Sequence, residues 1–414
     1  MFRAFVLAGL LATHVMASPL ADLVAGKTSA SPGLPGLVVV VADRNGVIRA
    51  EAFGAATIAP RRALSPATPL RVASISKAVV AIGVMRLVEA GTLDLDGDAS
   101  RWLGWPLRNP AFPDAPVTLR QLLSHTSGIV DGPGYNVPLG TTLRSSLAAD
   151  RWSTSPPGGR FEYANLNYGI IATVMEAATG ERFDRLMTRL VLAPLGLDAG
   201  YNWSGASDAA IRNAAILYRT GTDETDWHPD GPWVAQIDDL KGVRPACPVR
   251  TNGGCDLASY GPGTNGTLFS PQGGLRISAL GLAKIGRMLL GEGEVDGVRL
   301  LSPASVNTLM TPVWLASGRP QDNDYQGIMQ CYGPGLHCLT GGADSPVPGA
   351  HWWGHLGEAY GLLAGLWIDK ANARVLVYAM TGNRDDPFKP PHVSAFSAVE
   401  ETILTDLSAT PLPR

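Results

Sequence analysis

Strand-like sequence lies at both ends of this chain, and helix-like sequence lies between them. Near the amino end, two apolar runs flank the pair Asn45-Gly46, which indicates a hairpin over residues 37–53. Near the carboxyl end, residues 352–382 contain WWGHLG, YGLLAGLWID and RVLVYAMTG, which indicate three more strands. We therefore predict an α+β fold in which one antiparallel sheet is built from both ends of the chain, with helices flanking it and a mostly helical lobe inserted.

The domain boundaries that we predict follow the same pattern. Residues 18–90 and 265–414 are assigned to the α/β lobe that holds the sheet, and residues 91–264 to the mainly helical lobe. Within the second lobe, residues 200–264 are rich in Gly, Asp, Asn, Trp and Pro and show little periodicity. So long a stretch is typical of a functional or cross-linked loop. A ligand is expected in the crevice between the lobes.

The first 17 residues, MFRAFVLAGLLATHVMA, have the pattern of a secretory signal peptide. Arg3 supplies the positive start, residues 5–11 form a short apolar run, and Val15-Met16-Ala17 forms a small-residue cleavage site. The apolar run is too short to span a bilayer. We expect cleavage near Ala17 and an exported protein, periplasmic or secreted, without stable membrane insertion.

The four cysteines form two pairs that are close in sequence. Cys247 lies near Cys255, and Cys331 lies near Cys338. In the oxidising compartment that export implies, each pair is expected to form a disulfide within a loop. Zinc binding is the alternative, but no histidine lies near the first pair and only His337 lies near the second.

The net charge of the chain is small, −3 at pH 7. Such a balance does not favour nucleic acid or an acidic membrane surface as a partner. The expected partner is a small-molecule or peptide substrate, which Trp227 or Trp233 of the loop-rich segment is predicted to touch. No cofactor and no metal ion are predicted.

The residues Ser74-Ile75-Ser76-Lys77 begin a predicted helix that runs to Val88. Residues three apart share one face of a helix, so Ser74 and Lys77 are expected within hydrogen-bond reach. A serine hydroxyl becomes a good nucleophile when a neighbour takes its proton. A lysine whose pKa is lowered by burial can take it. An N-cap serine beside a surface lysine is the alternative, but apolar residues surround this lysine.

Two further stretches carry candidate side chains. Tyr163 and Asn165 lie two apart, and they offer a phenol for proton relay and an amide for binding. His355 and Gly357 lie on an apolar strand, where the glycine would let a substrate approach the backbone. A metal site at His351 and His355 is the alternative, but the sequence between them lacks the glutamate of the zinc-protease helix motif.

In this order and spacing the three motifs resemble those of the penicillin-recognising serine hydrolases. The most similar branch holds class C β-lactamases, serine D-Ala-D-Ala carboxypeptidases, D-aminopeptidases and family VIII esterases. The stretches LVEAGTLDLDGDAS, VTLRQLLSHTSG and SPQGGLRIS also resemble that branch, and the resemblance runs from about residue 35 to the carboxyl end. The resemblance implies the two-lobed fold predicted above and catalysis through an acyl-enzyme.

The resemblance also implies roles for individual residues. Ser74 would be the acylated nucleophile, and Lys77 and Tyr163 would share proton transfer, with the acylation base left open. Asn165 would orient Lys77 and the substrate amide. The backbone N–H groups of Ser74 and Glu358 would form an oxyanion hole.

The third motif departs from the family pattern, and the departure bears on the substrate. His355 stands where many relatives have lysine, Leu356 replaces a hydroxyl residue, and Glu358 follows Gly357. The lost hydroxyl and the added negative charge weaken the capture of a substrate carboxylate. We therefore favour an amide or ester hydrolase of the D-amino-acid peptidase or esterase type. The alternatives are a true β-lactamase and an inactive protein that binds cell-wall peptide. His125 is predicted to be structural.

Overall fold

The computed structural model describes residues 18–31, 33–221, 230–318, 322–384 and 392–412. The predicted signal peptide and Trp227 lie outside these ranges. Within them, no helix combines the length and the apolar character that crossing a bilayer requires.

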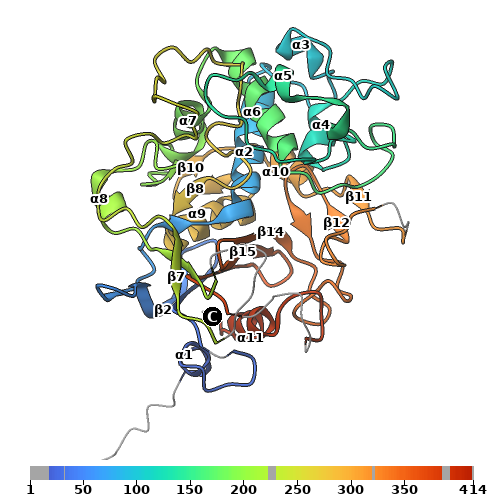
Figure 1. The fold of residues 1–414 in the computed structure, drawn as a ribbon. Coiled ribbons are helices and arrows are strands. Elements are labelled where there is room, and N and C mark those ends of the chain that lie inside the picture. Colours follow the sequence, from blue (N-terminus) through green and yellow to red (C-terminus); the bar gives the residue numbers. More distant parts are fainter. Residues whose placement is uncertain (1–17, 32, 222–229, 319–321, 385–391, 413–414) are drawn as a thin grey trace, which may run out of the picture.

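A nine-stranded antiparallel sheet lies at the centre of the molecule (Figure 1). Its order is β11-β12-β13-β14-β15-β16-β1-β2-β3. The strands are β1 (Gly36–Ala42), β2 (Val47–Thr57), β3 (Arg62–Ala63), β11 (Trp314–Leu315), β12 (Cys331–Tyr332), β13 (His337–Cys338), β14 (Trp353–Ala359), β15 (Leu362–Asp369) and β16 (Arg374–Met380). Because β1 pairs with β2 on one side and β16 on the other, the two ends of the chain meet in mid-sheet. The predicted α+β fold is confirmed.

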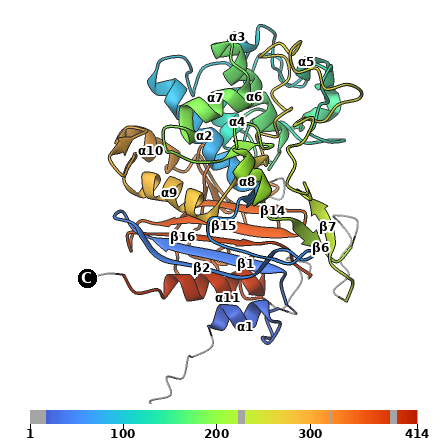
Figure 2. The same cartoon turned by 90° about the vertical axis from the view of Figure 1, so that its left-hand side faces the viewer.

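Helices cover both faces of this sheet, as Figure 2 shows. α1 (Pro19–Val24) and α11 (Ala398–Ser408) lie on one face. α9 (Ala279–Leu290) lies on the other, and α2 (Ser76–Glu89) and α6 (Leu166–Thr179) lie beyond it. The remaining helices of two turns or fewer are α3 (Ser100–Leu103), α4 (Leu119–Leu123), α5 (Leu143–Ser146), α7 (Phe183–Met187), α8 (Asp208–Arg212) and α10 (Pro303–Leu309).

The strand β1 shows why the sheet needs cover on both faces. Its sequence GLVVVVA is apolar throughout, and all seven residues are buried. Successive side chains of a strand point to opposite faces. Accordingly, Val38 and Val40 join the apolar core on the side of α9, whereas Val39 and Val41 join the core on the side of α11.

Several local predictions hold, and some boundaries shift. The hairpin at Asn45-Gly46 is confirmed, although its loop is held by the carboxylate of Asp43, which accepts from both backbone N–H groups. The predicted cap Ser278 accepts from the N–H of Gly281 at the start of α9. The last helix begins at Ala398 rather than at residue 393, because Ser397 and Glu400 form a capping box there.

Residues 200–264 contain short elements that the sequence pattern did not predict. They are β5 (Gly200–Tyr201), α8, β6 (Leu217–Arg219) and β7 (Val234–Ile237). β5 joins β4 (Leu70–Arg71) and β8 (Leu275–Ile277) in a small sheet, and β6 pairs with β7. A further small hairpin pairs β9 (Glu294–Val295) with β10 (Val298–Arg299).

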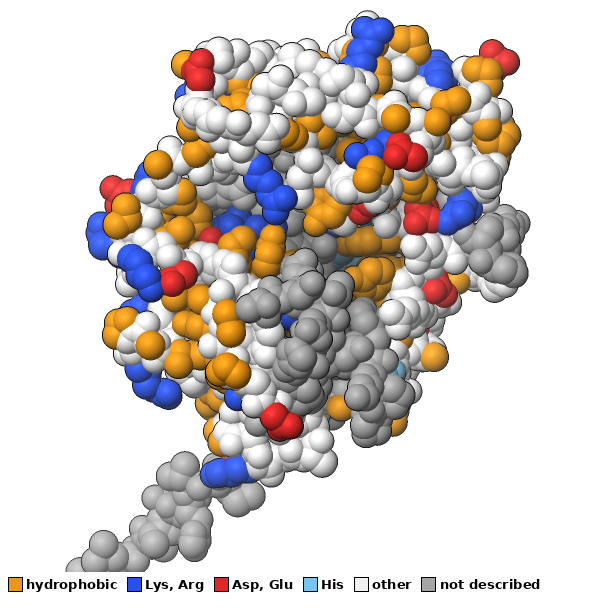
Figure 3. Space-filling view, in the orientation of Figure 1, with side chains coloured by type: hydrophobic (Ala, Val, Ile, Leu, Met, Phe, Trp, Pro, Cys, Tyr) orange, Lys and Arg blue, Asp and Glu red, His pale blue; other side chains and the backbone are white. Residues whose placement is uncertain are grey.

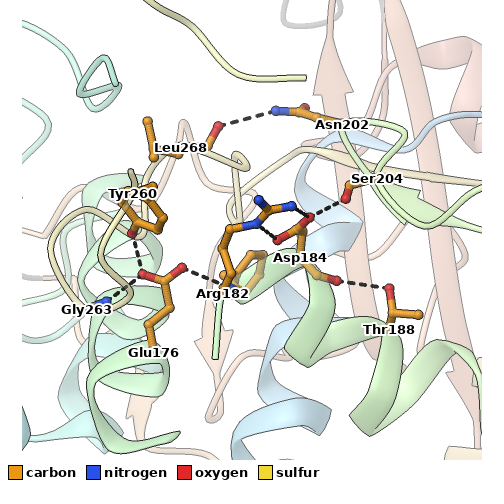
Figure 4. Close-up of polar contacts among 10 residues, drawn as sticks. Glu176, Arg182, Asp184, Thr188, Asn202, Ser204, Tyr260, Gly263 and Leu268 are labelled. Carbon is orange, nitrogen blue, oxygen red and sulfur yellow. Dashed lines mark hydrogen bonds and ion pairs between the residues drawn. The ribbon is translucent and has the colours of Figure 1, made fainter. Parts of the chain in front are cut away.

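The loop-rich segment is fastened at two places. Its disulfide Cys247–Cys255 is present, as is Cys331–Cys338, which joins β12 to β13, so both predicted pairings are confirmed. The carboxylate of Glu176 on α6 accepts from the Tyr260 hydroxyl and from the N–H of Gly263, as Figure 4 shows. The end of the segment is thereby tied to the helical part of the molecule.

Candidate active site

Ser74 lies on a tight turn between a strand and a helix. The chain leaves β4, passes through Ala73 with φ of +44°, and makes a single turn of 3₁₀ helix over Ala73–Ile75 before α2 begins at Ser76. A positive φ is uncommon for a residue other than glycine and reverses the chain direction sharply. The turn leaves Ser74 partly exposed, whereas Lys77, one turn further on, is fully buried.

The amine of Lys77 contacts three oxygen atoms. Its Nζ lies 2.9 Å from Ser74 Oγ, 2.8 Å from Asn165 Oδ1 and 3.1 Å from the carbonyl oxygen of Gln272. Burial lowers the pKa of Lys77 to about 7, although the nearby negative charge of Asp131 opposes the shift. A large fraction of this amine is therefore neutral near pH 7.

The contacts of Lys77 determine where a neutral amine would direct its lone pair. A neutral amine has two N–H donors and one lone pair. The carbonyl of Gln272 can only accept, and Asn165 presents its oxygen because its Nδ2 donates to Asp131 Oδ2 at 3.0 Å. These two acceptors take both donors. The lone pair is left facing the Ser74 hydroxyl, in the arrangement that a general base requires.

Asp131 holds Asn165 in place, and sequence reasoning missed it. One carboxylate oxygen accepts from Asn165 Nδ2, and the other accepts from the N–H of Leu166 at 2.8 Å, at the first residue of α6. The signal that could have found it is the acidic residue a few positions after the family-like stretch LSHTSG. The carboxylate fixes which way the Asn165 amide faces.

Tyr163 completes the group around the serine hydroxyl. The side chain of Ser74 is near enough to counter the rise in the pKa of this phenol, and Lys77 Nζ lies 4.8 Å from the centre of its ring. Burial raises the pKa of Tyr163, with Asp131 adding to the shift, so the phenol keeps its proton at neutral pH. The ring is supported from behind by His125, whose centroid lies 4.4 Å away and whose Nδ1 accepts from the N–H of Ala164.

These side chains open onto a cleft of about 380 Å³. Its wall includes Ser74, Tyr163, Asn165 and Glu358, four of the residues predicted from the sequence. It also includes residues that were not predicted: Arg71, Ala73, Asp131, Tyr135, Arg219, Gln272, Gly273, Tyr325, Ala359, Tyr360, Gly361 and Leu362. Figure 3 shows the molecule in the orientation of Figure 1. A hollow crosses the middle of this view, and Lys and Arg side chains gather along its left side.

Comparison with known proteins identifies the family. Residues 19–396 match the family model described as beta-lactamase. The chain belongs to the beta-lactamase family. The resemblance to penicillin-recognising serine hydrolases is confirmed at the level of the family.

Two curated relatives match part of this beta-lactamase-family chain. Esterase EstB from Burkholderia gladioli is 32% identical over 218 residues, which are 48% of this chain and 54% of EstB. Penicillin-binding protein 4* from Bacillus subtilis (strain 168) is 28% identical over 169 residues, which are 39% of this chain and 36% of that protein. The matched stretch is thus about half the length of EstB and less than half that of the second relative.

Solved structures share the fold. The octameric penicillin-binding protein homologue from Pyrococcus abyssi superimposes with a TM-score of 0.63 at 20% identity, over 90% of this chain and 72% of that one. The D-amino acid amidase from Ochrobactrum anthropi SV3 gives a TM-score of 0.64 at 18% identity, over 94% of this chain and 96% of that one. At these identities the likeness shows the fold alone.

His355 and Gly357 do not lie where the sequence prediction had them. His355 is fully buried and does not line the cleft; its Nδ1 donates to the carbonyl of Leu356, and its Nε2 accepts from the Tyr332 hydroxyl. Burial and the nearby Lys77 hold the pKa of His355 well below its usual range, so the ring is neutral. The imidazole is therefore held inside the protein by Tyr332 and the backbone of β14, away from the cleft wall.

Gly357 serves the approach of the chain's own backbone rather than that of a substrate. A Cβ built at this position would lie 2.4 Å from the carbonyl oxygen of Val72. The missing side chain lets β14 pack directly against the turn that carries Ser74. The glycine thus sets the distance between the predicted nucleophile and the strand that ends at the cleft.

The positions of Trp233 and His351 bear on two further predictions, of a substrate contact and of a metal site. Trp233 is not among the residues of the cleft wall, and the guanidinium of Arg384 lies 4.3 Å from its ring centroid, so the prediction that Trp227 or Trp233 touches substrate gains no support from Trp233. The histidine His351, weighed as a metal ligand, is exposed while His355 is buried. In the ranges that the structure describes, no three His, Cys, Asp or Glu side chains gather as ligands around a metal ion would.

Proposed function

We propose that this chain is an exported serine hydrolase that cleaves an ester or amide through an acyl-enzyme on Ser74. One observation carries the proposal: the Ser74 hydroxyl lies at the cleft surface, 2.9 Å from a buried amine whose pKa is about 7. A nucleophile paired with a base that is poised near the working pH is the requirement for this chemistry.

In the proposed acylation step, neutral Lys77 takes the proton of Ser74 while Oγ attacks the substrate carbonyl carbon. The oxyanion that forms is received by the backbone N–H groups of Ser74 and Glu358. When the intermediate collapses, the departing alcohol or amine receives a proton from the protonated phenol of Tyr163, which Lys77 replenishes. Water then attacks the Ser74 ester by the same route, and the acid is released.

The assignment of Lys77 rather than Tyr163 as the acylation base rests on their opposite pKa shifts. Burial lowers the pKa of Lys77 to about 7 and raises that of Tyr163. Near pH 7 the amine is therefore substantially free to accept a proton, whereas the phenol can only give one. Asn165 and Asp131 act as positioning residues, because they hold the amine in the orientation that faces the hydroxyl.

The substrate class that we propose is an ester or an amide of the D-amino-acid type. Esterase EstB is a relative by sequence, and the D-amino acid amidase is a neighbour by fold. Export is supported by the signal-like amino end together with the two disulfides, which form in oxidising compartments.

A probe and a substrate panel test the proposal together. A fluorophosphonate probe should label Ser74, and Ser74→Ala should abolish both labelling and turnover, whereas the exposed control Ser145→Ala should change neither. The panel should contain p-nitrophenyl esters, D-amino acid amides, D-Ala-D-Ala peptides and nitrocefin. Full activity in the Ser74→Ala variant would overturn the proposal. Labelling without turnover of any panel member would instead indicate a binding protein, and fast nitrocefin hydrolysis a β-lactamase.

A further inference from the structure

A second cavity adjoins the reactive cleft and shares a wall with it. This cavity, of about 260 Å³, is named here the side chamber. Its far wall includes Cys247 and Arg250 of the disulfide-linked loop, and the wall that it shares with the cleft consists of Arg71, Tyr135, Gln272 and Tyr360. A molecule that occupies the cleft at Ser74 and extends past Arg71 would enter this chamber.

Arg71 is a buried cation that forms no ion pair with any described residue. Only 8% of the surface of Arg71 is exposed, and its Nε is buried with no hydrogen-bond partner. No described residue forms an ion pair with its guanidinium or accepts a hydrogen bond from it. Burial lowers the pKa of Arg71 to about 10, which still leaves the group protonated at neutral pH. A buried charge is costly unless it is paired, so this position favours an anion from outside the chain.

The neighbouring arginine provides a comparison within the same small sheet. Arg276 is the register partner of Arg71 across β4 and β8, and it is fully paired. Its Nη2 lies 3.0 Å from Asp238 Oδ1 and its Nε 3.2 Å from Asp238 Oδ2, while Nη1 donates to Asn202. Asp238 also accepts from Trp203, so the only carboxylate that the described residues contribute to the wall of the side chamber is engaged already.

The surroundings of Arg71 hold its guanidinium ready for a planar anion. The group lies 5.0 Å from the ring centroid of Tyr360, at a distance typical of a cation–π contact. Such a contact leaves the N–H groups in the guanidinium plane available for a carboxylate. The backbone of Gly273 also lies close to the guanidinium, since a Cβ built on that glycine would lie 3.5 Å from Arg71 Nη2. Arg250 adds a second, exposed positive charge to the chamber wall.

We propose that the side chamber binds a carboxylate on the acyl part of the substrate, with Arg71 as its partner. The inference rests on the proposed function, since it assumes that the acyl group is attached to Ser74. The acyl part is assigned to the chamber because it stays attached to the enzyme while the leaving group must depart. The third motif, on β14, predicted weak capture of a substrate carboxylate. The proposal revises that prediction, because Arg71 supplies the carboxylate contact that the motif lacks.

The test compares two p-nitrophenyl esters that differ in one terminal group. The adipate monoester carries a free carboxylate, and the hexanoate ester has the same chain length without it. The wild-type enzyme should show a kcat/KM at least about tenfold higher for the adipate ester, because a hydrogen bond to a charged group is being made. In Arg71→Gln the ratio should fall to about one, while the exposed control Arg185→Gln should keep the wild-type ratio.

The outcomes separate this inference from the proposed function. If neither ester is hydrolysed by the wild-type enzyme, the esterase activity has failed. If both are hydrolysed equally well, or if the preference survives in Arg71→Gln, the side chamber assignment alone is overturned. It is also overturned if a carboxylate on the leaving group (4-carboxyphenyl hexanoate against phenyl hexanoate) gives the preference instead.

A measurement on the wild-type enzyme covers the case in which Arg71→Gln does not fold. Free adipate should inhibit hydrolysis of the hexanoate ester competitively, and hexane-1,6-diol at the same concentration should not. Raising the salt concentration should weaken inhibition by adipate, because ions screen a charge pair. Equal inhibition by the two compounds would overturn the inference.

Discussion

Replacing Asp131 by asparagine offers the sharpest test of how the buried amine is tuned. The carboxylate accepts from Asn165 Nδ2 at 3.0 Å and from the N–H of Leu166 at 2.8 Å, and its charge raises the pKa of Lys77. Asp131→Asn removes the charge and keeps the shape. The pKa of Lys77 should therefore fall below its wild-type value of about 7.

The size of the change follows from the geometry. Lys77 Nζ and Asp131 lie at the ends of two hydrogen bonds, of 2.8 and 3.0 Å, that are joined by the amide of Asn165. The charges are thus at most roughly 8 Å apart, which corresponds to about 2 kcal/mol at an effective dielectric constant of about 20. Because Asp131 is partly exposed, solvent screening reduces this to about 1 kcal/mol, or a little under one pKa unit.

The assay is the rate of Ser74 labelling by a fluorophosphonate between pH 5 and 9. Lys77 must be neutral to accept the proton, so the wild-type rate should rise with pH and reach half its maximum near pH 7. In Asp131→Asn the midpoint should move toward acid by up to about one unit. The variant should also lose about 1–3 kcal/mol of stability, since an amide N–H would now face a donor.

The matched control is Asp114→Asn, which removes the same charge from an exposed carboxylate outside the cleft. Its labelling profile should coincide with that of the wild-type enzyme. A midpoint in Asp131→Asn that stays in place or moves toward alkaline pH would refute the link between Asp131 and Lys77.

Three further perturbations have defined outcomes. Lys77→Arg should reduce the labelling rate about 100-fold or more with the fold retained by circular dichroism, because a guanidinium cannot release its proton; near-normal labelling contradicts the base assignment. Gly357→Ala should lower the free energy of unfolding, measured by urea denaturation, by about 1–3 kcal/mol, because its Cβ would lie 2.4 Å from the Val72 carbonyl oxygen. The control Gly253→Ala has open space around its Cβ and should lower it little, so equal losses would count against the packing argument. Burial raises the pKa of Glu176 to about 6, so the folded protein holds this proton more tightly than the unfolded chain does. As pH rises from about 4.5 to about 6, the wild-type protein should therefore lose up to about 2 kcal/mol of stability relative to Glu176→Gln. Parallel curves of stability against pH for the two proteins would exclude this linkage.

Much of the fold could be predicted because its longer strands and helices have recognisable local sequence patterns. A strand such as β1 is an uninterrupted apolar run, and the cap Ser278 marks the start of α9. The pair Ser74 and Lys77 could be predicted because three residues make about one helical turn, whatever else the chain does. The short strands β11 to β13 could not, since two-residue strands carry no period of their own.

The site residues also divide into those that the sequence identified correctly and those whose position only the folded structure shows. The sequence identified Tyr163 and Asn165 through motif and order, and they reach the amine across 86 and 88 positions of chain. His355 has equally suggestive spacing, but the structure buries it beneath the cleft against Tyr332. Burial depends on what packs over a strand, and a strand's own sequence does not record that.

The sequence alone thus determined that this chain builds one sheet from its two ends and brings a serine and a lysine together at a helix start. Both results follow from interactions between near neighbours and from strand pairing, which one-dimensional patterns encode. Only the tertiary structure decided which charges are neutralised. Arg276 is ion-paired with Asp238, whereas no carboxylate of the described residues forms an ion pair with Arg71, although the two arginines face each other across one pair of strands. Coulomb energy and desolvation depend on distances through space, so the difference between a structural arginine and a candidate binding arginine appears only once the chain has folded.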